Sequence, residues 1–152
     1  FERADHERMA VAFDIGGPGQ TSYQIAEWRH VIEKYHNIHF IACHILVPKQ
    51  LEQPGWAEEL KSIAAGNTWF DFAAIPYNNM QEYPYPTAAK LVEQAAEIVG
   101  VDRLMWGSDA PFVLSYATYA QLRDYIRESG VFGDADLRKL YGENAVQAYR
   151  IR

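Results

Sequence analysis

Four short apolar segments recur along this chain of 152 residues, and their starts lie roughly thirty residues apart. They cover residues 9–15, 39–44, 68–75 and 103–107. A separation of this size is the length of one strand–helix–strand unit, so each segment is expected to be a strand. The repeat therefore predicts a parallel sheet covered by helices.

Helical patterns occupy the intervals between these segments. In the first interval, apolar residues recur at helical spacing, and Thr21 and Gln24 stand where a capping box would start the helix. Glycines follow the next three patterns, as at the carboxyl ends of helices. The expected helices cover residues 25–35, 55–65, 87–99 and 119–129, with a closing pair of short helices on either side of Gly142.

Two α/β architectures fit this alternation. A doubly wound sheet would be complete with four or five strands, whereas a (β/α)8 TIM barrel needs about 250 residues. The chain opens on Phe1 and enters a strand-like segment without a strand–helix unit of its own before it. That start favours the barrel, with residues 1–152 as a single domain that forms its carboxyl-terminal half and supplies strands five to eight.

Composition excludes several kinds of partner. The formal net charge is −6, which argues against a surface that binds nucleic acid. The apolar segments are too short to span a membrane, and the charged residues 1–9 do not resemble a signal peptide. Cys43 is the only cysteine, so no internal disulfide is possible, and the expected location is the cytoplasm.

Polar residues follow the strands at their carboxyl ends, where parallel α/β folds place their chemistry. Asp14, His44 and Asp109 each close an apolar run. Alternation along a strand places His44 on the face of Phe40 and Ala42, and Asp109 on the face of Met105. Asp14, His44 and Asp109 are therefore expected to converge on one mouth, where an imidazole and carboxylates suit a divalent metal or an acid–base pair.

Other polar residues have a plainer interpretation. Asp14 is explained equally well as a cap of the next helix. Asp71 lies within an apolar run and is interpreted as structural. His39 enters its strand roughly 17 Å from His44 and should not join the site, while Cys43 and Ile41 should point away from the mouth. Tyr77, Tyr83 and Tyr85 either form a wall for the substrate or stiffen a proline-rich loop.

Three stretches of the chain resemble the carboxyl-terminal half of the amidohydrolase-related family of TIM-barrel metal-dependent hydrolases and decarboxylases. Residues 33–44 are similar to the helix and strand that end in the sixth-strand histidine, which here is His44. Residues 103–112, with the sequence RLMWGSDAPF, resemble the eighth-strand segment that carries Asp109. Residues 140–145, with an Asn-Ala pair after a glycine, are similar to the closing helix.

The resemblance implies a metal-dependent hydrolase or a non-oxidative decarboxylase that acts on a small, carboxylated substrate. Asp109 would bind the metal and take a proton from the attacking water or from the substrate, and His44 would be a ligand or a substrate contact. Asp14 stands where the family often has a histidine and would be a third ligand. The expected metal is a divalent cation, zinc in the first instance. The amino-terminal His-x-His pair of the family is absent from these residues.

Two alternatives remain open from the sequence. One is a metal-independent, lactonase-like hydrolase on the same barrel that keeps Asp109 as its base. The other is a non-catalytic, flavodoxin-like module that binds a ligand. A half-barrel leaves two strand edges unpaired, so a homo-oligomer is also expected to be possible.

Overall fold

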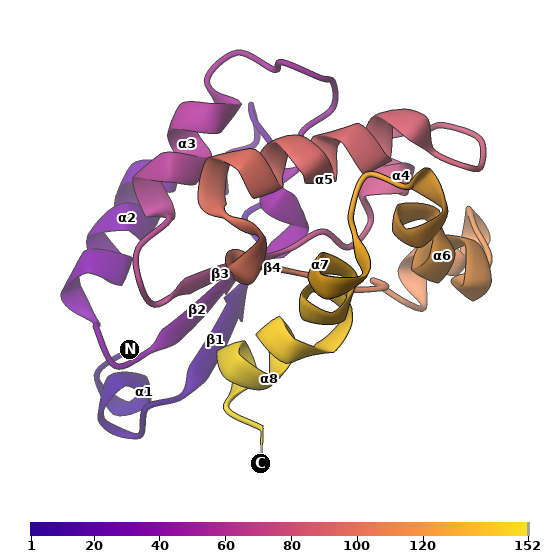
Figure 1. Ribbon diagram of the computed structural model, residues 1–152. Coiled ribbons are helices and arrows are strands. Elements are labelled where there is room, and N and C mark those ends of the chain that lie inside the picture. The colour runs from indigo at the N-terminus through magenta and orange to yellow at the C-terminus, as the bar shows by residue number, and fades with distance from the viewer. Residues whose placement is uncertain (152) are drawn as a thin grey trace.

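The sheet contains four parallel strands. The computed structural model describes residues 1–151. Its strands are β1 (Ala10–Phe13), β2 (His39–Ala42), β3 (Thr68–Asp71) and β4 (Leu104–Met105), and they pair in the order β1-β2-β3-β4 (Figure 1). Ile41 lies opposite Ala12 on one side and opposite Trp69 on the other. The carboxyl ends of all four strands therefore lie along the same edge of the sheet.

The strand order decides between the two expected architectures. Each strand pairs with the next in sequence, without the reversal that a doubly wound sheet requires. Successive right-handed crossovers in one direction place their helices on one face. Figure 1 shows this arrangement for α2 (Ile25–Lys34), α3 (Trp56–Ile63) and α5 (Pro86–Val99). The fold is part of a (β/α)8 barrel, and the flavodoxin-like alternative is wrong.

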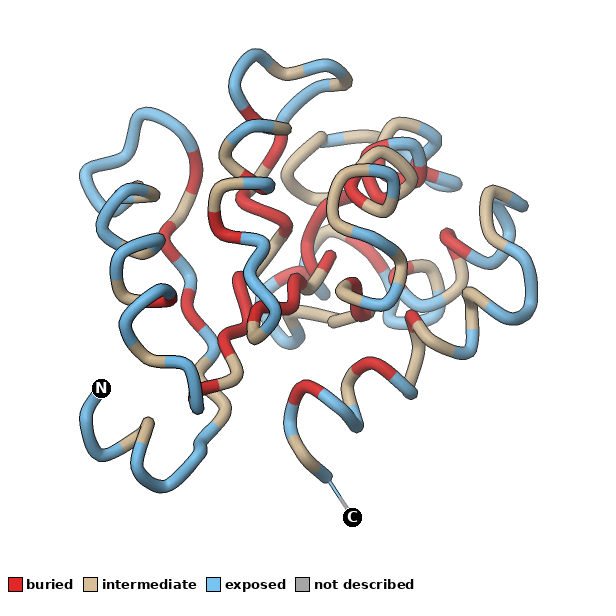
Figure 2. Tube along the Cα trace, turned by 60° about the vertical axis from the view of Figure 1, so that its left-hand side comes forward, coloured by how far each residue is buried: buried red, intermediate tan, exposed pale blue. Residues whose placement is uncertain are grey.

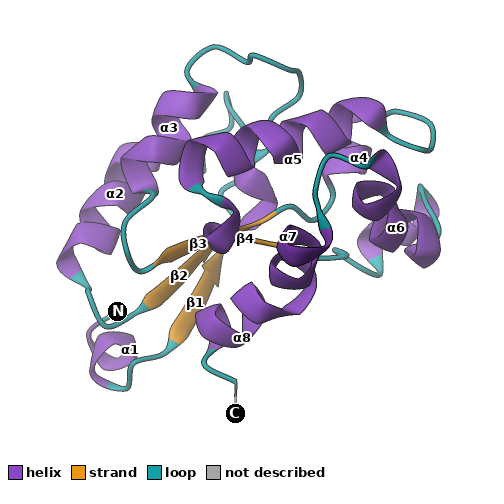
Figure 3. Ribbon diagram, in the orientation of Figure 1, coloured by secondary structure: helices purple, strands orange, loops and turns teal. Residues whose placement is uncertain are grey.

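Some elements depart from the expected bounds. The run at 68–75 is interpreted in the sequence as one strand, but β3 ends at Asp71 and residues 75–79 form α4 (Ile75–Asn79). Pro76 explains the change, because proline suits the first turn of a helix and cannot donate to a strand ladder. The remaining helices, shown in Figure 3, are α1 (Glu2–His6), α6 (Tyr119–Ser129), α7 (Asp134–Arg138) and α8 (Asn144–Tyr149).

The main hydrophobic core lies between the sheet and its helices. The strands contribute Phe40, Phe70 and Leu104, which are fully buried, and the helices contribute residues such as Leu60 and Leu91. Figure 2 shows the buried residues following the strands and the inner sides of the helices. Burial of each such side chain stabilises the fold by about 1.5–3 kcal/mol. This core fixes the strands and, with them, the positions of their carboxyl ends.

A second, smaller cluster covers the other face of the sheet, where Ile41, Trp69 and Met105 pack with Ala148 of α8. Ile41 thus points away from the main helix layer, and Phe40 and Ala42 point into it. The sequence analysis expected Phe40 and Ala42 to share the face of His44 and Ile41 to point away from the mouth, and this expectation is wrong. The reason is that β2 ends at Ala42 and the backbone of residues 44–47 turns left-handed, so the face of His44 does not extend back along the strand.

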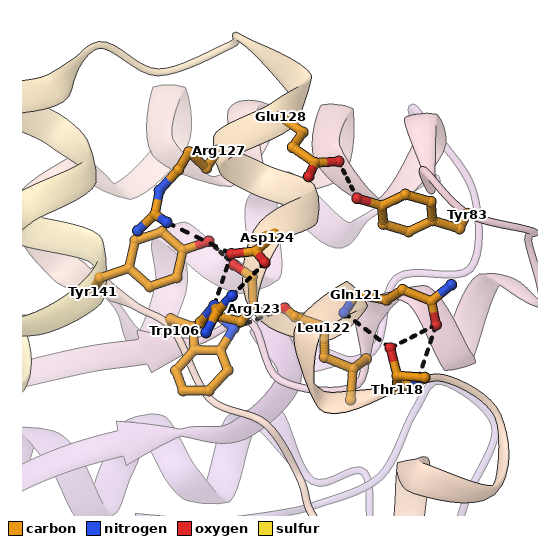
Figure 4. Close-up of polar contacts among 10 residues, drawn as sticks. All are labelled: Tyr83, Trp106, Thr118, Gln121, Leu122, Arg123, Asp124, Arg127, Glu128 and Tyr141. Atoms are coloured by element: carbon orange, nitrogen blue, oxygen red, sulfur yellow. Dashed lines mark hydrogen bonds and ion pairs between the residues drawn. The ribbon is translucent and has the colours of Figure 1, made fainter.

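Strand β4 is tied to helix α6 by a polar contact, drawn in Figure 4. The indole N–H of Trp106 donates a 2.9 Å hydrogen bond to the carbonyl of Leu122. At the start of α6, Thr118 and Gln121 form a capping box. These contacts anchor both sides of the loop that carries Asp109.

Within residues 1–151, no helix combines the length and the apolar character needed to cross a membrane.

Candidate active site

A cavity of about 350 Å³ opens at the carboxyl ends of the strands. Asp14 follows β1, His44 follows β2 and Asp109 follows β4, and all three line this cavity. Its wall also includes Gln20, Tyr77, Asn78 and Phe112. The structure thus brings together the three residues that the sequence placed on one mouth.

His44 is held in an unusual backbone conformation. The four residues from His44 to Val47 all have positive φ angles, between 42° and 62°. The backbone N–H of His44 donates a 2.9 Å hydrogen bond to Oδ1 of Asp71. The turn thereby brings the imidazole to the cavity, with its side chain only 14% exposed.

The contacts of the imidazole fix its protonation pattern. Nδ1 lies 3.0 Å from the carbonyl oxygen of Ala73, and a carbonyl oxygen can only accept. In the neutral ring Nδ1 therefore carries the proton and Nε2 presents its lone pair. Nε2 lies 3.7 Å from Oδ2 of Asp14. His44 can act there as a ligand, an acceptor or, when protonated, a donor.

Asp71 supports this arrangement. Its Oδ1 accepts hydrogen bonds from the backbone N–H groups of His44 and Ala73, at 2.9 and 3.0 Å. The structural interpretation made from the sequence missed that Asp71 is the last residue of β3 and holds the turn of a site residue. Its place at the end of an apolar run is the signal that could have revealed this.

Asp14 does not cap the next helix, because α2 begins only at Ile25 and Gln24 is its N-cap residue. Its Oδ1 instead accepts a 2.8 Å hydrogen bond from the backbone N–H of Gly16, and its side chain is 59% exposed. The second oxygen faces Nε2 of His44. Asp14 is therefore free to bind a ligand from the cavity.

Asp109 is more enclosed than Asp14. Its backbone has a φ of 54°, a left-handed conformation that turns the chain immediately after β4. Partial burial raises the pKa of its carboxyl group, and the charges of Asp71 and Asp14 raise it further, while His44 opposes the shift. A carboxylate with a raised pKa is a stronger base than one in water, which suits proton transfer.

Cys43 does not line the cavity, although its thiol lies near Asp71. Burial raises the pKa of its thiol well above the usual range, and the charges of Asp71, Asp14 and Asp109 act in the same direction. The thiol therefore stays protonated. Cys43 is a poor nucleophile in this environment.

The three tyrosines that could form a wall for the substrate or stiffen a loop do not share one role. Tyr77 lines the cavity and meets Phe112 edge to face, with ring centroids 5.2 Å apart. Tyr85 is buried in the core, and Tyr83 binds Glu128 on the surface (Figure 4). Tyr77 alone of the three tyrosines forms part of the cavity wall.

His44, Asp109 and Asp14 have side chains of the types that bind metals, but they do not form a complete set of ligands. Imidazole nitrogen and carboxylate oxygen are ordinary zinc ligands. Within residues 1–151, however, no three His, Cys, Asp or Glu side chains gather closely enough to hold a metal ion by themselves. The metal-binding role of His44, Asp109 and Asp14 stays a prediction.

Comparisons with known proteins identify the fold. The amidohydrolase family model matches residues 11–151. An amidohydrolase from Burkholderia multivorans superposes with a TM-score of 0.82 at 15% identity, over 99% of this chain and 56% of that one. In a second crystal form, with bound zinc, the TM-score is 0.81 at 15% identity, over 99% of this chain and 55% of that one. No curated protein matches the chain.

A decarboxylase shares the same fold. The 5-carboxyvanillate decarboxylase from Sphingomonas paucimobilis superposes with a TM-score of 0.62 at 12% identity, over 99% of this chain and 52% of that one. The chain thus spans about half the length of the solved structures that it matches. This agrees with the half-barrel predicted in the sequence analysis.

Proposed function

The chain belongs to the amidohydrolase family, and from this premise we propose that it carries the carboxyl-terminal half of the active site of a metal-dependent hydrolase or non-oxidative decarboxylase. The observation that carries the proposal is the shared cavity of His44 and Asp109, which reach it from two different strands. Its volume of about 350 Å³ suits a small molecule. The proposed substrate is small and carries a carboxylate.

Asp109 is the proposed proton carrier. In hydrolysis, its carboxylate takes the proton of the water that attacks the carbonyl carbon. In decarboxylation, the same carboxyl group carries the proton that replaces the departing carbon dioxide on the substrate. Partial burial supports both roles, because it raises the pKa of this group toward the range in which it can accept and return a proton.

His44 orients the substrate in this proposal. Its Nδ1 is engaged by the carbonyl of Ala73, so Nε2 is the atom that faces the cavity. Among the described residues that line the cavity, His44 is the only basic side chain. Asn78 adds an amide that can donate a hydrogen bond to a substrate oxygen.

A divalent metal fits the ligand types at this mouth. His44, Asp109 and Asp14 are its proposed ligands in this chain, and zinc, present in one related structure, is the proposed ion. With the ion bound, Nε2 of His44 would hold the metal instead of contacting the substrate. When bound, such an ion polarises a carbonyl group and lowers the pKa of water.

The test uses the full-length protein and the variant Asp109→Asn. Turnover is measured on a panel of carboxylated lactones, amides and aromatic acids, by proton release and by release of carbon dioxide. The variant should lose activity by at least about a hundredfold, as general-base removal does, and keep its circular dichroism spectrum and melting temperature. Asp134→Asn, at an exposed position on α7, is the matched control and should remain active. Near-normal turnover of Asp109→Asn would remove Asp109 from the mechanism.

Metal analysis of the same preparation tests the proposed metal dependence. One tightly bound equivalent of zinc, lost together with activity on chelation, supports metal dependence. Full activity without metal supports the lactonase-like alternative, with Asp109 as base.

A further inference from the structure

A second cavity, of about 550 Å³, lies at the opposite end of the strands. Its wall includes His39, the first residue of β2, and Asn67, which directly precedes β3. Arg8 and Arg150 come from the two ends of the chain and also line it. This cavity shares no lining residue with the candidate active site.

The two arginines that line this cavity, Arg8 and Arg150, differ from most other arginines that the structure describes. Five of the arginines that the structure describes form ion pairs with Asp or Glu, namely Arg3, Arg29, Arg123, Arg127 and Arg138. Figure 4 shows two of them converging on Asp124. Arg8, Arg103 and Arg150 form no such pair within residues 1–151, and Arg103 instead stacks on the ring of Trp69 beside His39. Two arginines without a carboxylate partner among the described residues, Arg8 and Arg150, thus line the same cavity.

The guanidinium of Arg150 is held in position by neutral partners. It donates to the backbone carbonyl of Asn37 at 2.9 Å and to the carbonyl of Arg8. Carbonyl oxygens orient the group but do not cancel its charge. Burial lowers the pKa of Arg150, and the nearby charge of Arg8 lowers it further, so the two cations repel each other. An anion between them would relieve this repulsion.

The charges of nearby arginines also act on the imidazole of His39. Its Nδ1 lies 3.0 Å from the carbonyl of Ala148, and its ring lies against Trp69 with centroids 4.5 Å apart. Burial lowers the pKa of His39, and the charges of Arg150 and Arg103 also oppose its protonation. The only carboxylate in the described lining of the cavity is Glu33, which lies 4.0 Å from Arg29 on the same helix.

We propose that this cavity is an anion site for a small phosphorylated organic molecule, whose phosphate group lies between Arg8 and Arg150. A phosphate group carries close to two negative charges at neutral pH and accepts paired hydrogen bonds from guanidinium groups. The cavity is larger than a phosphate ion needs, and Ile32 and Ala65 offer an apolar wall for the organic part. Because the site lies away from the candidate active site, its ligand stabilises or regulates the protein and does not react there. The inference does not depend on the proposed function.

The test is a titration of the full-length protein with inorganic phosphate, at ionic strength held constant with chloride. Binding is followed by calorimetry and by the nuclear magnetic resonance signals of the His39 ring. Saturable binding with a shift of the His39 signals is expected. Arg8→Gln, whose side chain is exposed, should weaken binding about tenfold, as loss of one charged hydrogen-bonding partner does. Glu33→Gln should strengthen it, because it removes the carboxylate at the site.

Arg138→Gln is the matched control, since it removes the same charge from α7. Phosphate binding that does not saturate, or that Arg8→Gln and Arg138→Gln weaken equally, would overturn the site. Glycerol phosphate should bind more tightly than inorganic phosphate. Equal or weaker binding of glycerol phosphate would overturn the assignment of an organic ligand.

Discussion

The backbone N–H of His44 donates a 2.9 Å hydrogen bond to Oδ1 of Asp71, which joins the ends of two neighbouring strands. The bond supports a strained segment. His44, Ile45, Leu46 and Val47 all have left-handed backbone angles, which cost about 1–2 kcal/mol for each residue other than glycine. Such strain persists only where the surroundings impose it, and it is typical of functional sites. Asp71 is therefore the residue on which the position of His44 depends.

Replacement of Asp71 tests this dependence. Asp71→Ala removes the acceptor of two backbone N–H groups, so the free energy of unfolding should fall by about 1–3 kcal/mol and turnover should fall as well. Asp71→Asn keeps a side-chain oxygen that can accept both bonds and should retain most of the stability. Urea unfolding and turnover are measured for both. Equal behaviour of the two variants would show that the acceptor does not hold the turn.

The close approach of Gly107 to the neighbouring loop gives a second prediction. A Cβ at this position would lie 3.0 Å from Cβ of Ala73, which is tighter than ordinary contact. Gly107→Ala should therefore destabilise the protein by about 1–3 kcal/mol and displace the loop that carries Asp109. Unfolding and turnover should both report the loss.

Two further variants separate this clash from a general effect of alanine. Adding Ala73→Gly removes the opposing methyl group and should restore much of the activity. Gly142→Ala lies in a helical turn where a Cβ meets nothing within 4 Å, so it should not destabilise the protein. Failure of the double variant to recover would mean that the contact with Ala73 is not the cause.

The strand repeat predicted the sheet and its helices because it reflects burial, which the sequence encodes directly. The ends of elements were harder to predict. Residues 68–75 are mostly apolar, yet β3 gives way to α4 within them, since apolar content does not distinguish a buried strand from a buried turn. The capping box expected at Thr21 and Gln24 is wrong, because Gln24 donates to the carbonyl of Thr21 instead. The capping box at Thr118 and Gln121 was missed.

The site was predictable as far as the strand ends determine it. Asp14, His44 and Asp109 follow three strands, and parallel strands end at one edge. The orientation of Ile41 was not predictable. It depends on a left-handed turn at residues 44–47 that contains no glycine to signal it. The support from Asp71 depends on the same turn and was missed for the same reason.

Asn144 is expected to matter more for stability than its small size suggests. It is 1% exposed, and its amide nitrogen donates to the carbonyls of Val101 and Leu104, at 2.8 and 2.7 Å. Asn144→Ala leaves these buried carbonyls without that donor and should cost about 1–3 kcal/mol in chemical unfolding. Gln147→Ala, at an exposed position of the same helix, should change the free energy of unfolding little. Similar losses in the two variants would contradict this role of Asn144.

The pairing of Asp5 with Asn37 predicts how stability depends on pH. The two carboxylate oxygens of Asp5 accept from the side-chain and backbone nitrogens of Asn37, at 3.0 and 2.9 Å. These bonds lower the pKa of Asp5 in the folded state. Its contribution to stability is therefore present above the unfolded pKa of about 3.9 and is lost as the pH falls through the lower folded value.

Comparison of melting temperatures tests this sign. Asp5→Ala should melt below the parent protein at about pH 7, and the difference should shrink at about pH 2, where the carboxyl group is protonated in both states. Asn37→Ala removes the side-chain donor and keeps the backbone N–H, so at about pH 7 Asp5→Ala should cost less in that background than in the parent protein. A difference that is as large in acid as at neutral pH would show that Asp5 acts through packing and not through its charge, since protonation removes the charge and leaves the side chain in place.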